Sequence, residues 1–332
     1  MSAPPFADVL VVIPCLDEAA HLPGLLATLL RDAPGATVAV ADGGSTDGSR
    51  AIVERVAADH PAVRLVDNPG RLQSIGINQA AALLGEGKRW LVRVDAHCFY
   101  PPDYVGGLLA AARGSGANAV VVPMRSVGRG CFQRAAAAAQ NSRLGTGGSP
   151  HRHVGRGAWV DHGHHALFEM DRFRALGGYD EGFSHNEDAE LDHRQTSGGA
   201  RLWLEPSLAL DYLPRATPAA LARQYFRYGQ GRARTLMRHG MPIKPRQLLP
   251  LGVIPAAALL PFGLLWWPLA VPAGLWAALS LGYGALLGAR ARSGCAALSG
   301  AAAMIMHLSW ALGFLGQRLG RRRDAPQGLS AI

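Results

Sequence analysis

The sequence predicts an α/β domain with a mostly parallel sheet, followed by a region of transmembrane helices. Three observations support this prediction. Short apolar runs alternate with amphipathic stretches near the N-terminus, polar side chains follow several of these runs, and two long stretches near the C-terminus carry no charge. Strands that alternate with helices need crossover connections, which give a mostly parallel sheet. A chain of 332 residues favours one or two compact domains.

Four strands and three helices are expected in the first 95 residues. Residues 9–13 form a short, fully apolar run rich in β-branched residues, as buried parallel strands do. The runs 37–41, 63–66 and 90–94 are expected to be the next three strands. Between them, residues 21–31, 50–59 and 73–84 are expected to be helical. Ligands of such sheets bind beyond the carboxyl ends of the strands. The polar residues that follow the first, second and fourth runs are Asp17, Glu18, Asp42, Asp95 and His97.

The composition indicates a membrane protein rather than a soluble or disordered chain. Charged residues make up 17%, well below the roughly 25% of soluble domains, and hydrophobic residues make up 49%. The net charge is +9, and much of the basic excess flanks the apolar stretches, as on the cytoplasmic side of membrane proteins. We expect no nucleic-acid partner, because no aromatic residues are interleaved with the basic ones and the sequence contains no known nucleic-acid-recognition motif.

Two uncharged stretches predict the membrane region. Residues 248–289 and 293–317 contain no Asp, Glu, Lys or Arg. About 20 apolar residues cross a bilayer as a helix, so the first stretch is long enough for two passes. The second could form a third pass or lie in the interface. We expect residues 241–332 to form a membrane-anchoring region with two or three hydrophobic helices and a basic tail; a buried soluble hairpin is the alternative.

The remaining region, residues 1–240, is expected to be a cytoplasmic domain. Residues 1–8 carry no Lys or Arg and precede only a short apolar run, which does not fit a signal peptide. The protein should therefore be a multi-pass protein of the inner (cytoplasmic) membrane that contacts membrane lipids.

The cysteines and histidines do not predict a zinc site. None of the cysteines belongs to a C-x-x-C pair, so we expect reduced thiols at Cys15, Cys98, Cys131 and Cys295. Five histidines cluster near the middle of the chain, accompanied at ligand spacing only by Asp161. We interpret their stretch as a segment on the acceptor side of a site; they are His151, His153, His162, His164 and His165.

Five motifs, in order along the chain, resemble those of the family 2 glycosyltransferases. They lie at residues 13–18, 42–49, 94–97, 186–191 and 224–228. The resemblance covers roughly residues 9–240. Within the family, the sequence is similar to the membrane-anchored bacterial enzymes that build exopolysaccharides such as succinoglycan. It implies the GT-A fold and an inverting hexosyltransferase that uses a UDP-sugar donor and a lipid-linked or saccharide acceptor.

The resemblance places the nucleotide beside the first two motifs. Asp42 would accept a hydrogen bond from the uracil ring. Glu18 and the backbone near Pro14 would face the ribose and base. Arg71 would pair with a phosphate, since its guanidinium presents a fork of donors. Without the resemblance, Arg71 would be a solvated surface group. Asp47 is better explained as a helix cap.

The segment from Asp95 to His97 occupies the place of the D-x-D motif of the family. Alternate residues on an extended segment point the same way, so both side chains can reach one ion. A divalent cation, Mn²⁺ or Mg²⁺, would bridge the donor phosphates there. The imidazole favours manganese. The alternative, in which Asp95 binds the metal without His97, stays open.

The resemblance assigns the general base to Asp188, with Glu187 shaping the site beside it. Both acids also suit the first turn of a helix, where the helix dipole favours negative charge, and the two interpretations are compatible. Gln224 and Arg227 share one helical face and would contact the acceptor and the diphosphate. Tyr228 stands where processive synthases have Trp, which weakens a processive interpretation.

Three alternatives to this function remain open. The chain could be a processive polysaccharide synthase or a polyprenyl-phosphate glycosyltransferase. Outside the enzymes, it could be a non-catalytic nucleotide-sugar-binding membrane subunit. The presence of Asp42, Asp95, Asp188 and Arg227 favours an enzyme.

Overall fold

The computed structural model describes residues 5–148 and 155–320, and the chain forms two compact units. The first unit comprises Met1–Arg125 and His153–Tyr212, and the second comprises Ser126–Arg152 and Leu213–Ile332. The division at residue 240 between a cytoplasmic part and a membrane anchor stays a prediction; the compact units divide the chain elsewhere, because residues 126–148 and 213–240 pack with the C-terminal helices. A boundary drawn from composition alone cannot reveal a middle segment that packs against the end of the chain.

The first unit is built on an eight-stranded sheet with the strand order β3-β2-β1-β4-β8-β5-β9-β7. The strands β3, β2, β1 and β4 are mutually parallel, β5 is parallel to β9, and β8 runs antiparallel to both of its neighbours. The sheet is therefore mostly parallel, as predicted. Its strands are β1 (Val9–Cys15), β2 (Thr37–Asp42), β3 (Val63–Asp67), β4 (Trp90–Arg93), β5 (Ala119–Val122), β7 (Ala158–Val160), β8 (His164–Glu169) and β9 (Leu202–Leu204). A separate two-stranded sheet pairs β6 (Met124–Ser126) with β10 (Leu210–Tyr212).

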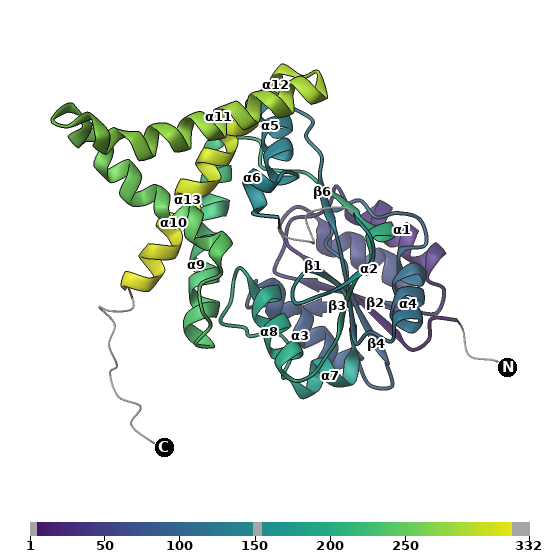
Figure 1. Cartoon of the computed structure of the whole chain (residues 1–332). Coiled ribbons are helices and arrows are strands. Elements are labelled where there is room, and N and C mark those ends of the chain that lie inside the picture. The colour runs from purple at the N-terminus through teal and green to yellow at the C-terminus, as the bar shows by residue number, and fades with distance from the viewer. Residues whose placement is uncertain (1–4, 149–154, 321–332) are drawn as a thin grey trace. The chain divides into compact units, whose positions relative to one another are not determined.

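Helices cover both faces of the large sheet, which explains why its central strands are apolar throughout (Figure 1). Alternate residues of β1 enter two different cores: Val9, Val11 and Ile13 in one, Leu10 and Val12 in the other. The first core is covered by α1 (Leu22–Asp32), α2 (Ser49–Asp59) and α4 (Tyr104–Ser115). The second is covered by α3 (Gln73–Leu84), α7 (Met170–Ala175) and α8 (Glu187–Ser197).

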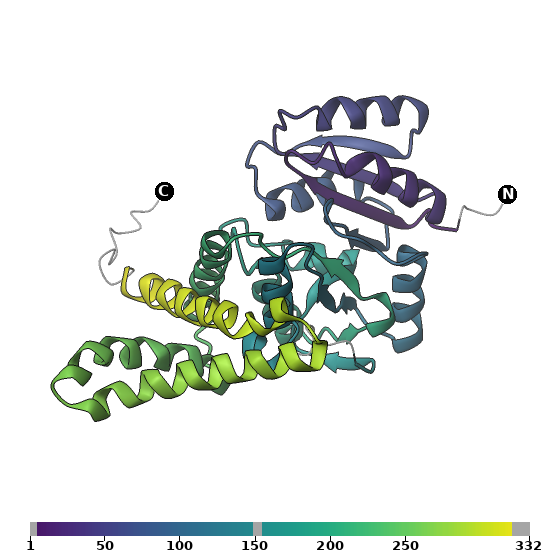
Figure 2. The ribbon, with the colours of Figure 1, turned by 90° about the horizontal axis from the view of Figure 1, so that it is seen from above.

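The second unit consists of helices. Residues 126–152 contribute α5 (Cys131–Gln140) and α6 (Arg143–Thr146). The C-terminal part contributes α9 (Pro218–Arg238), α10 (Pro245–Leu259), α11 (Val271–Ala291), α12 (Gly294–Ala297) and α13 (Ser299–Gly320). Figure 2 shows α10 and α11 running side by side as a hairpin. The exposed side chains of Trp266 and Trp267 lie in the connection between these two helices.

Three stretches are long and apolar enough to cross a membrane: Pro245–Leu264, Trp267–Arg290 and Gly294–Gly320. This confirms the expected hydrophobic helices. Only 17% of each of the first two apolar windows is buried within the protein, against 44% of the third. The third is more buried because α13 packs against α9, α5, α10 and α11.

Two glycines allow α9 and α13 to approach closely. A methyl group at Gly229 would clash with the backbone of Trp310, and one at Gly313 would clash with the backbone carbonyl of Phe226. Small residues at such positions let helix backbones meet. The motif at residues 224–228 is thus carried by a helix whose position depends on α13.

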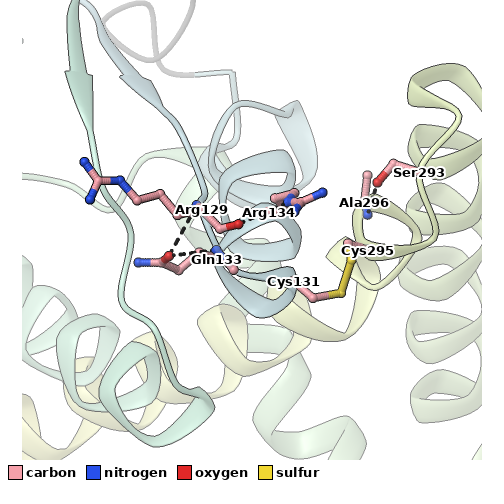
Figure 3. The surroundings of a disulfide bond; sticks show 8 residues. Arg129, Cys131, Gln133, Arg134, Ser293, Cys295 and Ala296 are labelled. Carbon is pink, nitrogen blue, oxygen red and sulfur yellow. Dashed lines mark hydrogen bonds between the residues drawn. A yellow bond between two sulfur atoms is a disulfide. The ribbon is translucent and has the colours of Figure 1, made fainter.

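The cysteines correct one prediction. Cys131 and Cys295 form a disulfide with a Cα–Cα distance of 5.1 Å, so the expectation of reduced thiols is wrong for this pair (Figure 3). Cys15 and Cys98 are free, as expected. The pair was not foreseen because 164 residues separate its members, and only the packing of α12 beside α5 brings them together. Both cysteines lie in the first turn of their helices, where Gln133 accepts from the backbone N–H of Gly130 and Ser293 accepts from that of Ala296.

Candidate active site

The carboxyl ends of β1, β2 and β4 form the edge of the sheet at which the polar motifs meet. In the strand order β3-β2-β1-β4, the direction of the connections reverses beside β1, and ligands of open α/β sheets bind at such switch points. The backbone N–H of Gly43 donates to the carbonyl of Cys15 over 2.8 Å, which joins the loops after β2 and β1. The imidazole Nδ1 of His97 lies 2.7 Å from Glu18 Oε1, which joins the loops after β4 and β1.

Asp42 ends β2 and organises the loop that follows. Its side chain is 2% exposed. The carboxylate accepts from the backbone N–H groups of Gly44 and Ser45 and from the Ser45 hydroxyl, 2.5 Å away. Asp42 therefore lies where the sequence placed it, and its bonds hold the glycine-rich turn in shape. Its role toward a nucleotide base stays a prediction.

The other residues predicted to bind the nucleotide lie around the same loops. Pro14 pairs with Ala41 in the register of β1 and β2. Arg71 is exposed and has a positive φ of 57°. Its Cα lies beside Gly43, 3.5 Å from where a Cβ on that glycine would stand. Asp47 accepts from the backbone N–H of Ser49, the first residue of α2, but the N-cap position itself is held by Gly48, one residue after Asp47.

A buried arginine holds the acidic motifs together. Arg93 ends β4 with a side chain that is 4% exposed. Its Nε lies 3.1 Å from Asp95 Oδ1, and one of its terminal nitrogens lies 2.7 Å from Asp188 Oδ1 and 3.7 Å from Glu187 Oε1. These contacts bring the predicted base and the predicted cation ligand to one place. The sequence analysis missed Arg93, although a charged residue inside a buried apolar run always needs a partner.

The site strongly perturbs its titratable groups. Burial alone would lower the pKa of Arg93, but Asp188 and Asp95 outweigh burial and hold it well above its ordinary value. Burial alone would raise the pKa of Asp95, but Arg93 and His164 outweigh it and hold that pKa below its ordinary value. Glu187 differs, because burial and the neighbouring charge of Asp188 raise its pKa to about 7. Such perturbed groups are typical of functional sites.

The two carboxylate oxygens of Asp188 face different neighbours. Oδ1 accepts from Arg93 and from the hydroxyl of Tyr179, at 2.7 and 2.9 Å. Oδ2 lies 3.7 Å from the Nδ1 of His164. Glu187 and Asp188 open α8, with Asn186 in the left-handed conformation before them, so the predicted helix start is confirmed. The role of Asp188 as the base stays a prediction.

His164 lies between the two aspartates. Its Nε2 is 3.7 Å from Asp95 Oδ2, and its Nδ1 is 3.7 Å from Asp188 Oδ2. The imidazole is 12% exposed. The sequence analysis assigned His164 only to a histidine-rich segment, and nothing in its local pattern distinguishes it from its neighbours.

Of the other histidines in this segment, the structure describes the side chain of His162 alone. The Nδ1 of His162 lies 2.6 Å from the buried carboxylate of Asp192. His151 and His153 lie outside the described residues. The described part of the chain has no group of three or more His, Cys, Asp or Glu side chains arranged to hold a metal ion.

This site nonetheless suits a divalent cation that binds together with a nucleoside diphosphate. Magnesium-like ions are held by one or two protein carboxylates plus phosphate oxygens and water. Asp95 Oδ1 accepts from Gln73 and Arg93, whereas Asp95 Oδ2 faces the imidazole of His164. One carboxylate oxygen beside an imidazole is a donor pair that suits manganese.

Gln224 and Arg227 belong to α9 in the second unit. Gln224 is buried and donates to the hydroxyl of Tyr228 over 2.9 Å, whereas Arg227 is exposed. Their roles toward acceptor and diphosphate stay predictions.

The sequence and the fold both match known glycosyltransferases. The family model described as Glycosyl transferase family 2 matches residues 10–177. The chain is 47% identical over 316 residues to the succinoglycan biosynthesis protein ExoA of Rhizobium meliloti (strain 1021), covering 95% of this chain and 96% of that protein. Among solved structures, it resembles the mannosyltransferase PcManGT from Pyrobaculum calidifontis in complex with GDP-Man and Mn²⁺, with a TM-score of 0.66 and 18% identity over 95% of this chain and 88% of that one. The likeness confirms the predicted GT-A fold, and the family match confirms the predicted family: the chain belongs to glycosyl transferase family 2.

Proposed function

We propose that this glycosyltransferase is an inverting hexosyltransferase of exopolysaccharide synthesis. It moves a sugar from a UDP-sugar to a lipid-linked saccharide acceptor at the cytoplasmic face of the inner membrane. Support comes from the relative named for succinoglycan biosynthesis, whose similarity extends over nearly the whole of both chains. The three apolar stretches long enough to cross a membrane support a membrane-anchored enzyme, with its nucleotide-binding domain outside the bilayer.

The observation that carries the proposal is the joint pairing of Asp95 and Asp188 with the buried Arg93. The two aspartates come from segments far apart in the chain, after β4 and at the start of α8. Their pairing with one arginine supports the proposal that Asp188 accepts a proton close to Asp95, the proposed ligand of the cation that would hold the donor diphosphate. Transfer requires these two functions within reach of one sugar.

In the proposed reaction, the acceptor hydroxyl oxygen forms a bond to the anomeric carbon while the bond from that carbon to the diphosphate breaks. UDP leaves with the bonding electrons, and Asp188 takes the hydroxyl proton. Attack opposite the leaving group inverts the configuration.

Arg93 and Tyr179 hold Asp188 in place through hydrogen bonds to Oδ1. A proton acceptor whose position is fixed in advance does not need to reorganise during the reaction. Glu187, with a pKa of about 7, is the competing candidate base, since a base is most effective when its pKa lies near the working pH.

A bound divalent cation would offset the charge that develops on the leaving diphosphate. Asp95 is the proposed protein ligand, held in position by Gln73 and Arg93 through Oδ1. The proposed nucleoside contacts are Asp42, Glu18 and the backbone near Pro14. Arg71 is proposed to contact the phosphates. In α9, Gln224 is proposed to contact the acceptor and Arg227 the diphosphate. Residues 1–240 are the proposed cytoplasmic part, and residues 241–332 are the proposed membrane anchor.

A donor screen with two variants tests this proposal. Membranes containing the protein are incubated with labelled UDP-hexoses, and with GDP-mannose because the structural neighbour was solved with GDP-Man. Asp188→Asn should keep nucleotide binding and lower transfer at least 10³-fold, an order of magnitude expected for a lost general base. Glu187→Gln should retain transfer within about 10-fold. Loss of transfer in Glu187→Gln alone would assign the base to Glu187. No transfer from any donor would point to a non-catalytic subunit.

A further inference from the structure

We propose that His164 is a ligand of the divalent cation, and that Asp188 orients the imidazole through its other nitrogen. This inference rests on the proposed function and adds a residue to its cation site. The sequence analysis named His97 as the histidine ligand, two residues after Asp95. The structure offers a second imidazole beside the same aspartate.

The geometry on the Asp95 side leaves room for a shared ion. Nε2 of His164 and Oδ2 of Asp95 are 3.7 Å apart, which is longer than a hydrogen bond. An ion held at about 2.1 Å from each of two donor atoms bridges any separation up to about 4.2 Å, so 3.7 Å lies within reach. Asp95 Oδ2 faces this imidazole, because Gln73 and Arg93 donate to Oδ1.

The Asp188 side has the arrangement that commonly accompanies a metal-binding histidine. A ligating imidazole usually donates its second ring N–H to a carboxylate, which fixes the tautomer and the ring orientation. Nδ1 of His164 lies 3.7 Å from Asp188 Oδ2, so a small shift brings the two into hydrogen-bond contact. Asp188 in turn is held by Arg93 and Tyr179.

His97 is less suited to the same role. Its Nδ1 lies 2.7 Å from Glu18 Oε1, and its side chain is 54% exposed, against 12% for His164. A largely buried ligand on a strand of the sheet, such as His164, is held more rigidly than an exposed one in a loop. His164 begins β8, which pairs with β4 directly before Asp95.

The arrangement would link proton removal from the acceptor to binding of the donor diphosphate. The proposed base, Asp188, and the proposed cation ligand, Asp95, contact opposite nitrogens of one ring. Binding of the cation with the donor would fix the ring and add one hydrogen bond to those from Arg93 and Tyr179 that already hold Asp188.

The test measures Mn²⁺ binding to the purified protein in the presence of UDP. Electron spin echo spectroscopy of bound Mn²⁺ detects coupling to a directly ligating imidazole nitrogen, and calorimetry gives the affinity. We expect the nitrogen coupling in the wild type and its loss in His164→Ala and His164→Asn, with affinity about 10-fold weaker or more. His97→Ala and His162→Ala are the matched controls and should keep the coupling.

The outcomes separate this inference from the proposed function. Coupling that persists in folded His164 variants, or is lost in His97→Ala, overturns the role of His164 and leaves the proposed function standing. Undiminished Mn²⁺ binding by Asp95→Asn removes the cation site itself and contradicts both. If the His164 variants fail to fold, the wild type and the two control variants still decide, since retention of the nitrogen coupling in both controls eliminates His97 and His162 as its source.

Discussion

The guanidinium of Arg93 lies 2.7 Å from Asp188 Oδ1 and 3.1 Å from Asp95 Oδ1, in a position that is almost fully buried. Three carboxylates surround this one cation, those of Asp95, Glu187 and Asp188. The cluster therefore keeps an excess of negative charge when no ligand is present. An excess of this kind suits a site that receives a divalent cation with its substrate.

The first prediction concerns removal of the cation at the centre of the cluster. Arg93→Ala should destabilise the protein by about 3–5 kcal/mol at pH 7.5, because buried carboxylates are left without their partner. The loss should be smaller at pH 5, where protonation relieves the repulsion among them. Thermal unfolding of the detergent-purified protein at both pH values measures this.

Arg89→Ala is the matched control for this prediction. Arg89 directly precedes β4 and is exposed, stacking on the ring of Trp90. Its removal should change stability by less than about 1 kcal/mol. Equal effects of the two substitutions would show that Arg93 is an ordinary surface charge and would contradict the account of the site.

The second prediction follows from the raised pKa of Glu187. This pKa is about 7 in the folded protein, whereas the ordinary value for a glutamate is 4.5, so the folded protein binds more protons than the unfolded chain between these values. The free energy of unfolding should therefore fall as pH rises from about 4.5 to 7. Glu187→Gln removes this dependence and should raise the unfolding temperature above that of the wild type at pH 8, with little difference at pH 4.5.

Glu86→Gln serves as the comparison, because Glu86 is exposed and lies outside the site. Its unfolding temperature should follow that of the wild type at every pH between 4.5 and 8. If Glu187→Gln also follows the wild type throughout, Glu187 is not a protonated, buried carboxyl group.

Sequence patterns predicted the elements whose signal is local. Each of the strands β1 to β4 contains a short apolar stretch, and the predicted helix 73–84 matches α3 (Gln73–Leu84). The later strands β5, β7 and β9 were not predicted, since runs of three or four residues carry little periodicity. The motif residues were found because a family resemblance supplied their roles.

What the sequence could not supply depends on contacts between distant segments. Arg93 looks like the end of an ordinary strand until α8 places two acids beside it. His164 is one of several histidines until β8 pairs with β4. The Cys131–Cys295 bond spans 164 residues and has no local signature.

The third prediction tests the close packing of α9 on α13. Gly313→Leu would drive a side chain into the backbone of Phe226, so α9 must move and with it Gln224. We expect a loss of about 1–3 kcal/mol or more from overpacking, together with a fall in transfer activity. Gly316→Leu is the control on the same helix, since nothing lies within 4 Å of a Cβ at Gly316. An equal response of both variants would contradict the predicted contact.

The fourth prediction concerns the disulfide between α5 and α12. Protein purified in air and denatured without reductant should contain two reactive thiols, Cys15 and Cys98, and four after reduction. Cys131→Ser should lower stability by about 2–4 kcal/mol under oxidising conditions, because the bond closes a long loop in the unfolded chain. With reductant present, the variant and the wild type should unfold at similar temperatures, which separates loss of the bond from loss of packing. Four reactive thiols in the protein before reduction would show that the bond does not form, even in air.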